Sequence, residues 1–105
     1  MSESDIQREI LEALGPYNHI KIWRTNSGRA KYNIRLAPAG TPDIIGYIIW
    51  GKNAGKFLGI EVKEPGKPQK PKQIEFQCEL TSAGGFYFLV HSKDEAVKLV
   101  EGLMK

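Results

Sequence analysis

The chain of 105 residues has a net charge of +3, and its 41% hydrophobic and 26% charged content is typical of one folded domain, residues 1–105, and excludes a disordered chain. Cys78 is the only cysteine, which excludes an internal disulfide and a cysteine-based zinc site. The acidic N-terminus lacks the pattern of an export signal, and the longest apolar stretch, 44–50, is far shorter than the roughly 20 residues that span a bilayer, so we expect a cytoplasmic protein without membrane contacts.

The first half of the chain predicts one helix followed by two strands. We expect a helix over 4–14, because Ser4 and Gln7 have the spacing of a capping box and apolar residues recur on one face. Residues 19–24 alternate apolar and polar side chains as a short strand does, whereas 43–50 are nearly all apolar, as in a central strand.

The second half of the chain predicts a strand, a helix, a further strand and a closing helix. A hairpin turn at 52–55 leads into a strand over 56–63, and a proline-rich loop over 64–71 follows it. The next helix runs from Pro71 to the stop at Gly84-Gly85. A strand over 86–91 and a helix with Ser92 and Glu95 as a capping box complete the chain. The helix after Pro71 has Ile74, Cys78 and Thr81 on one face, with Phe76 and Leu80 beside it. The order αβββαβα predicts an α/β fold with a central mixed β-sheet flanked by helices.

Basic residues concentrate in two segments. The stretch from Ala13 to Pro42 has no Asp or Glu and five basic residues, and it includes a predicted loop over 25–41, long enough to be functional or mobile. Residues 52–72 hold six lysines against two glutamates. Such segments either contact a nucleic acid or simply solvate surface loops, and composition alone leaves both explanations open.

Three charged residues in the predicted hairpin form a candidate metal site. Residues two apart in a strand point to the same face, so Glu61 and Lys63 share a face while Val62 points to the opposite layer. Asp43 starts the preceding strand, and in an antiparallel hairpin that start lies opposite the end of the next strand. Two carboxylates, a backbone carbonyl and waters suit Mg²⁺ or Mn²⁺, and Lys63 can orient a water or stabilise developing charge. Taken singly, Glu61 and Lys63 also fit a strand that emerges into solvent, and Asp43 fits a turn.

Pro42-Asp43 followed by Glu61-Val62-Lys63 resembles the PD-(D/E)xK nuclease superfamily, and a longer series of blocks is similar to its virus-type replication-repair nuclease domain, VRR-NUC. In chain order the blocks are Glu3-Ser4-Asp5-Ile6-Gln7, Arg24-Thr25-Asn26-Ser27-Gly28, Gly40-Thr41-Pro42-Asp43-Ile44-Ile45-Gly46, Gly59-Ile60-Glu61-Val62-Lys63, Gln73 with Phe76, and Ala83-Gly84-Gly85. The resemblance implies a restriction-endonuclease-like core.

The resemblance also implies roles for individual residues. Asp43, Glu61 and the Val62 carbonyl would hold the metal, Lys63 would be catalytic, and Gln73 would lie near the site on a helix. Glu3 matches the acidic residue of the family's first helix, and Glu9 competes for that role. The residues expected to contact DNA are Arg24, Asn26, Ser27, Arg29, Lys31, Arg35, Lys67, Lys70 and Lys72, although Asn26 and Ser27 also fit an ordinary polar loop. The run Gln69-Lys70-Pro71-Lys72 departs from the family's usual helix start and leaves that start open.

The function that the resemblance implies is a Mg²⁺- or Mn²⁺-dependent DNA endonuclease of a bacterial cell or phage-infected host. It also implies a homodimer acting on Holliday junctions or other branched DNA in replication, repair or recombination. The alternative is a non-catalytic DNA-binding or partner-recruiting module. A nucleotide cofactor is not expected, because Asn53 replaces the hydroxyl residue of a P-loop in the stretch 46–52 and bulky apolar residues fill it.

Overall fold

The computed structural model of the protein describes residues 1–25 and 37–104. Its elements are α1 (Glu3–Leu14), β1 (Ile20–Arg24), β2 (Ile44–Ile48), β3 (Phe57–Val62), α2 (Pro71–Ser82), β4 (Phe86–Val90) and α3 (Lys93–Gly102). The predicted α/β order αβββαβα is confirmed, and the strands are one or two residues shorter than expected at their ends. Within the described ranges, no helix has the length and apolar content needed to cross a membrane.

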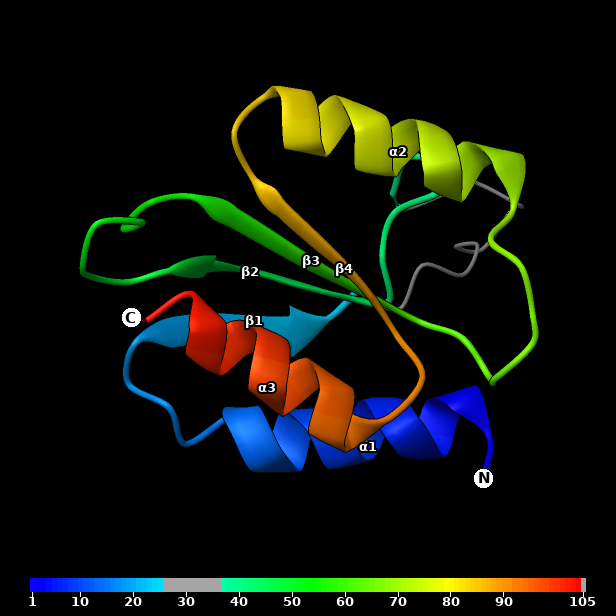
Figure 1. Ribbon diagram of the computed structural model, residues 1–105, viewed down its shortest axis with the longest axis horizontal. Helices are drawn as coiled ribbons and strands as arrows, with labels where there is room; N and C mark the ends of the chain where they lie inside the picture. The colour runs from blue at the N-terminus through cyan, green and yellow to red at the C-terminus, as the bar shows by residue number, and fades with distance from the viewer. Residues whose placement is uncertain (26–36, 105) are drawn as a thin grey trace.

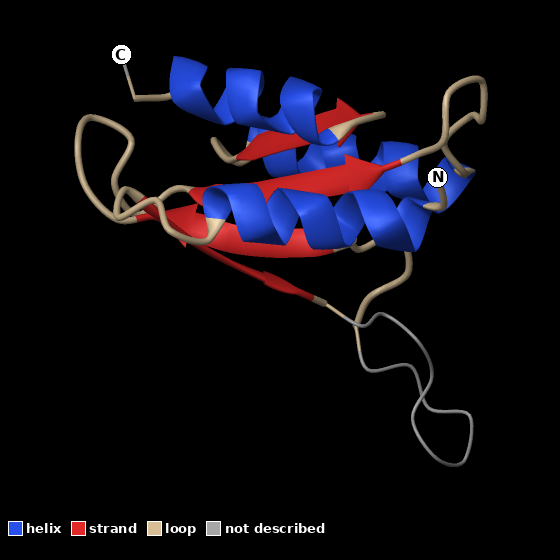
Figure 2. Cartoon of the chain, turned by 90° about the horizontal axis from the view of Figure 1, so that it is seen from below, coloured by secondary structure: helices blue, strands red, loops and turns tan. Residues whose placement is uncertain are grey.

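The four strands form one mixed sheet in the order β1-β2-β3-β4. β1 and β2 pair antiparallel, as do β2 and β3, whereas β3 and β4 are parallel because α2 connects them. α2 lies on one face of this sheet, and α1 and α3 lie on the other (Figure 1). β1 forms an edge of the sheet, at the bottom of Figure 2, away from α3. The sheet is thus the middle layer between two helical layers.

The main hydrophobic core lies between the sheet and the layer of α1 and α3. On β3 the alternate residues Leu58, Ile60 and Val62 are completely buried in this core. The helices supply the opposing side chains Ile6, Ile10, Leu14, Ala96 and Val100. Each fully buried aliphatic side chain contributes about 1.5–3 kcal/mol to folding. Because strand residues alternate, Gly59, Glu61 and the following Lys63 point to the other face, toward α2.

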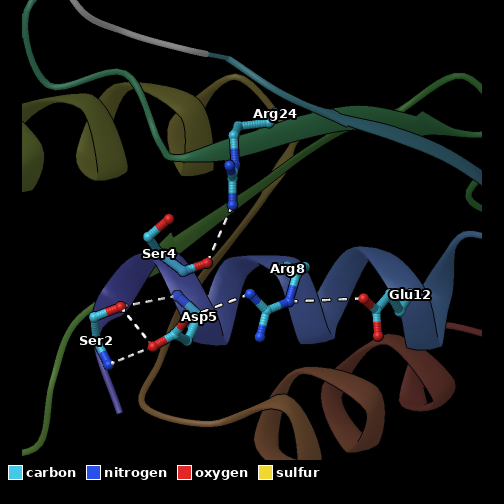
Figure 3. A network of polar contacts seen from close by, with 6 residues as sticks. All are labelled: Ser2, Ser4, Asp5, Arg8, Glu12 and Arg24. Carbon is cyan, nitrogen blue, oxygen red and sulfur yellow. Dashed lines mark hydrogen bonds and ion pairs between the residues drawn. The ribbon is translucent and has the colours of Figure 1, made fainter.

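The cap of α1 differs from the expected one. The Ser2 hydroxyl accepts a hydrogen bond from the Asp5 N–H, and the Asp5 carboxylate accepts one from the Ser2 N–H, so this pair forms the capping box (Figure 3). The prediction of Ser4 and Gln7 was wrong by two residues, because Ser2 has the same spacing to a shorter acidic side chain that also accepts a hydrogen bond.

The cap of α3 was predicted only in part. The Ser92 hydroxyl accepts from the Glu95 N–H, as expected. The Glu95 carboxylate, however, accepts from the N–H of His91 rather than from that of Ser92. The reciprocal half of the capping box therefore ties the end of β4 to the start of α3.

The sheet contact of α2 is narrow. None of its residues, all of which the structure describes, is buried, and the predicted apolar face of Ile74, Cys78 and Thr81 is exposed. The helix instead turns half-buried residues such as Phe76 and Leu80 toward the sheet. A Cβ at Gly59 would lie 2.9 Å from the Pro42 ring and 3.6 Å from Leu80, so glycine in the middle of β3 allows both to approach closely. Periodicity misassigned this face because the helix covers only part of the sheet.

Candidate active site

Asp43 and Val62 meet where β2 begins and β3 ends. The Asp43 carboxylate accepts a hydrogen bond of 2.9 Å from the Val62 N–H. The N–H and C=O of one strand residue point toward the same neighbouring strand, so the Val62 carbonyl also faces the side on which Asp43 lies. The two sequence-predicted ligands are therefore brought together by the antiparallel hairpin of β2 and β3.

Glu61 and Lys63 are the only two charged residues in the buried part of the described chain, with 2% and 7% of their surfaces exposed. Burial and the negative charge of the neighbouring Asp43 together raise the pKa of Glu61 to about 9, while Lys63 partly opposes the shift. The simpler explanation of a strand emerging into solvent does not apply to either residue. Two carboxyl groups are instead forced together beside one ammonium group.

One oxygen of Glu61 is left without a partner. Glu61 Oε2 accepts a hydrogen bond of 3.3 Å from Gln73 Nε2. Glu61 Oε1 is buried and has no hydrogen-bond partner among the described residues. A buried acceptor without a partner costs roughly 1–3 kcal/mol, so the position is suited to a group that donates a proton or carries positive charge.

The donor set fits a hard divalent cation with an incomplete protein shell. Mg²⁺ takes carboxylate and carbonyl oxygens and usually keeps several waters, which matches Asp43, Glu61 and the Val62 carbonyl. In residues 1–25 and 37–104, no group of three His, Cys, Asp or Glu side chains is placed to hold a metal. Any ion at Asp43 and Glu61 would therefore depend on backbone and water ligands for the rest of its shell.

Of the two acidic residues considered on α1, Glu3 is the one near these carboxylates. Its side chain accepts a hydrogen bond of 3.1 Å from the N–H of Glu64, directly after Lys63. Its negative charge also contributes to the raised pKa of Glu61. Glu9 instead lines a separate pocket with Ile6 and His91. Helix α1 thus brings one carboxylate to the end of β3.

Gln73 connects the start of α2 to the carboxylates. Its carbonyl oxygen accepts from the Lys70 N–H at 2.8 Å while its amide nitrogen donates to Glu61, so the same side chain caps the helix and holds the carboxylate. The helix start that the sequence left open is Pro71, with Lys70 as the N-cap residue.

A pocket of about 450 Å³ opens beside Asp43, between the loop before β2 and the first turn of α2. Gly40, with φ of 86°, lies so close to this turn that a Cβ would overlap the Lys72 carbonyl oxygen. The pocket walls include Lys70 and Lys72. Two of the basic residues expected to contact DNA therefore lie next to a candidate ligand.

The other residues expected to contact DNA are placed less favourably or are not described. Arg24 points to the opposite helical layer, where its guanidinium donates to the Ser4 carbonyl of α1 at 3.1 Å (Figure 3). Lys67 forms an exposed ion pair with Glu64. Asn26, Ser27, Arg29, Lys31 and Arg35 lie outside the described residues.

Sequence reasoning gave no role to three polar residues that contact the site or its neighbours. The Thr25 hydroxyl donates to the carbonyls of Pro42 and Asp43, at 2.9 and 3.2 Å, and its N–H donates to the latter at 3.0 Å. His91 Nδ1 lies 3.0 Å from the Lys63 carbonyl oxygen. Burial, together with the charge of Glu61, raises the pKa of Tyr87 to about 12. Strand alternation in 86–91 could have indicated Tyr87, whereas Thr25 and His91 depend on contacts between distant segments.

Comparisons of the chain with known protein families, curated proteins and solved structures found no match. The likeness to the VRR-NUC domain therefore rests on the sequence blocks alone.

Proposed function

We propose that the protein is a divalent-metal-dependent DNA endonuclease of restriction-endonuclease-like fold. The observation that carries the proposal is the buried Glu61 beside the half-buried Asp43, with one Glu61 oxygen unpartnered and the buried Lys63 on the same strand face. A carboxyl group that is buried beside a second carboxylate is costly for folding and is most simply explained by a cation that both groups bind.

The side chains would divide the chemistry among them. Asp43, Glu61 and the Val62 carbonyl would hold Mg²⁺ or Mn²⁺, which supplies Lewis acidity toward a water and a phosphate oxygen when bound. Gln73 fixes the orientation of Glu61 through its amide. Lys63, buried on the face of Glu61, would orient the attacking water or stabilise negative charge on the phosphate. Glu3 adds a further acceptor beside the end of β3.

DNA is the substrate that the charge distribution supports best. Lys70 and Lys72 line the pocket beside Asp43, and the segment between Ala13 and Pro42 is free of acidic residues. Branched DNA such as a Holliday junction, and a homodimer that offers two sites to two strands, follow from the sequence resemblance and belong to this proposal. So does action in replication, repair or recombination in a bacterial cell or phage-infected host.

The second candidate is a DNA-binding or partner-recruiting module of the same fold without activity. A module of this kind has no use for a buried carboxyl group beside Asp43, and replacement of Glu61 by an apolar residue would relieve the cost of its burial. The presence of Glu61 together with its hydrogen-bond donor Gln73 favours the nuclease.

The decisive experiment is cleavage of labelled junction and linear duplex DNA with Mg²⁺ or Mn²⁺ by the wild-type protein and the Asp43→Ala variant. We expect metal-dependent cleavage that Asp43→Ala lowers by at least about 100-fold, because a lost ligand weakens both metal binding and water activation. Asp94→Ala is the matched control, since the Asp94 side chain is 91% exposed on α3. DNA binding without metal-dependent cleavage would falsify the nuclease proposal and favour the second candidate.

A further inference from the structure

An aromatic pair is exposed on the sheet face that carries the candidate site. Trp23 of β1 and Tyr47 of β2 are 44% and 41% exposed, and their rings contact each other edge to face with centroids 6.3 Å apart. In the register Trp23 lies opposite Ile45, and Ile45 lies opposite Gly59. Residues directly opposite each other share a face, and so do residues two apart, so Trp23 and Tyr47 are on the same face as Asp43 and Glu61.

No helix of residues 1–25 and 37–104 covers this face of β1 and β2. On this side of the sheet, α2 packs mainly on β4 and over Gly59 of β3. Ile45 is two residues from Asp43, which corresponds to roughly 7 Å along the strand, and Trp23 is the cross-strand neighbour of Ile45. The aromatic pair is therefore a direct continuation of the candidate active site, toward the edge of the sheet.

The charge of Lys21 on this face of β1 and β2 points to a phosphate-bearing partner. The exposed Lys21 lies opposite Tyr47 in the register and two residues from Trp23, so it shares the face with both rings. β1 and β2 contain no acidic residue, and Arg24, the other basic residue of the two strands, points to the opposite layer. Lysine is depleted from the centres of protein–protein contacts, whereas aromatic rings beside a basic residue are the usual platform for single-stranded nucleic acid.

We propose that Trp23 and Tyr47 stack against unpaired bases of single-stranded DNA, with Lys21 contacting the phosphates between them. If the bound DNA strand continues from the aromatic pair to Asp43 and Glu61, the preferred substrate carries unpaired nucleotides next to the cleaved phosphodiester bond. This second statement rests on the proposed nuclease function, and the binding itself does not. Bases within a duplex hide their faces, so the platform discriminates single strands from blunt duplex.

The test is the affinity for a labelled thymidine oligonucleotide and for a blunt duplex, measured by fluorescence anisotropy in EDTA so that no cleavage occurs. We expect Trp23→Ala and Tyr47→Ala each to weaken oligonucleotide binding about ten-fold and duplex binding less than two-fold, since each lost stack is worth about five-fold or more. Trp23→Phe, which keeps a ring, should bind nearly as the wild type does. Trp50→Ala is the matched control, because Trp50 is 54% exposed but follows the opposite end of β2.

Three results would overturn the proposal. The first is that Trp23→Ala and Tyr47→Ala bind the oligonucleotide with the same affinity as Trp50→Ala. The second is that these two variants lose as much affinity for the duplex as for the oligonucleotide. The third is a change from dimer to monomer by light scattering in Trp23→Ala or Tyr47→Ala, which would assign this face to a second copy of the chain. Circular dichroism melts of both variants, on two different strands, check that a loss of binding is not a loss of folding.

The outcome is separable from that of the nuclease proposal. If the wild type binds the oligonucleotide through the aromatic pair but cleaves no DNA with Mg²⁺ or Mn²⁺, the nuclease proposal alone fails. If cleavage depends on Asp43, but oligonucleotide binding and cleavage of gapped DNA are both equal in wild type and Trp23→Ala, the stacking proposal alone fails. If both hold, Trp23→Ala should lower cleavage of gapped DNA about ten-fold and leave blunt duplex cleavage nearly unchanged.

Discussion

The two faces of β3 differ in chemistry although they alternate along the same six residues. Toward α1 and α3, Leu58, Ile60 and Val62 are completely buried among aliphatic side chains. Toward α2, the same strand carries Gly59, then the buried Glu61, with Lys63 directly after it. The first face stabilises the fold by removing apolar surface from water, whereas burial of the charged groups on the second face lowers the free energy of unfolding.

This contrast indicates how a chain of this length can keep a charged site. The core of α1, α3 and the sheet holds nearly all of the large, completely buried side chains. The stability of the fold therefore depends little on apolar surface buried under α2. A site with a buried carboxylate can then lie on the weakly packed face, next to the pocket lined by Lys70 and Lys72. Changes on the two faces should therefore have different signs as well as different sizes.

The largest expected effect on stability is on the core face. Ile60→Ala should lower the free energy of unfolding by about 2–5 kcal/mol, because it leaves a cavity in a completely buried cluster. The matched change on the α2 face is Ile45→Ala, which removes the same atoms from a residue that is only partly buried. We expect less than half the loss there, measured by urea unfolding. Equal losses in the two variants would mean that the faces do not differ in packing as described.

The second expected effect has the opposite sign. In the folded protein the pKa of Glu61 is about 9, against an ordinary value of 4.5, so the folded state binds more protons than the unfolded state between these values. Unfolding free energy should therefore fall as pH rises through that window, and the loss is complete above the folded-state pKa. Glu61→Gln should remove this slope and stabilise the metal-free protein at pH 8 by about 1–3 kcal/mol.

Thermal melts of wild type and Glu61→Gln at pH 5 and pH 8 in EDTA measure this difference, with Glu79→Gln on α2 as the exposed control. Added Mg²⁺ or Mn²⁺ should raise the melting temperature of the wild type at pH 8 and leave that of Glu61→Gln nearly unchanged, because a ligand that binds only the folded state stabilises it. A destabilised Glu61→Gln at pH 8 would contradict the idea that Glu61 is a cost to the metal-free fold.

Much of this contrast could be predicted from the sequence, because strand alternation is local. The period of two in 57–63 assigns Val62 to the core and Glu61 and Lys63 to the other face, and the structure agrees. The hairpin of β2 and β3 likewise predicts that Asp43 approaches the end of β3, as its hydrogen bond with Val62 requires. Local pattern therefore predicted the relative placement of these residues, though not their hydrogen-bond partners.

Contacts between distant segments could not be predicted in this way. The exposed face of α2 and the second role of Gln73 depend on how far the helix extends over the sheet, which no local pattern encodes. Arg24 looked like a DNA contact because of its charge, but in the fold it donates to the Ser4 carbonyl, twenty residues earlier. Side chains of this kind are assigned only by the packing of whole elements against one another.

The smallest expected effect concerns Thr25, which ties the end of β1 to the backbone at Asp43. Its hydroxyl donates to the carbonyls of Pro42 and Asp43, so Thr25→Val should cost about 1 kcal/mol of stability through the lost hydrogen bonds. If Thr25 positions Asp43, the same variant should also lower kcat for DNA cleavage about three- to ten-fold with little change in KM, because the carboxylate shifts relative to the bound substrate. Thr25→Ser, which keeps the hydroxyl, should restore kcat. A loss of stability in Thr25→Val without a change in kcat would mean that this contact supports only the fold, and that the Val62 N–H alone is enough to hold the Asp43 carboxylate in place.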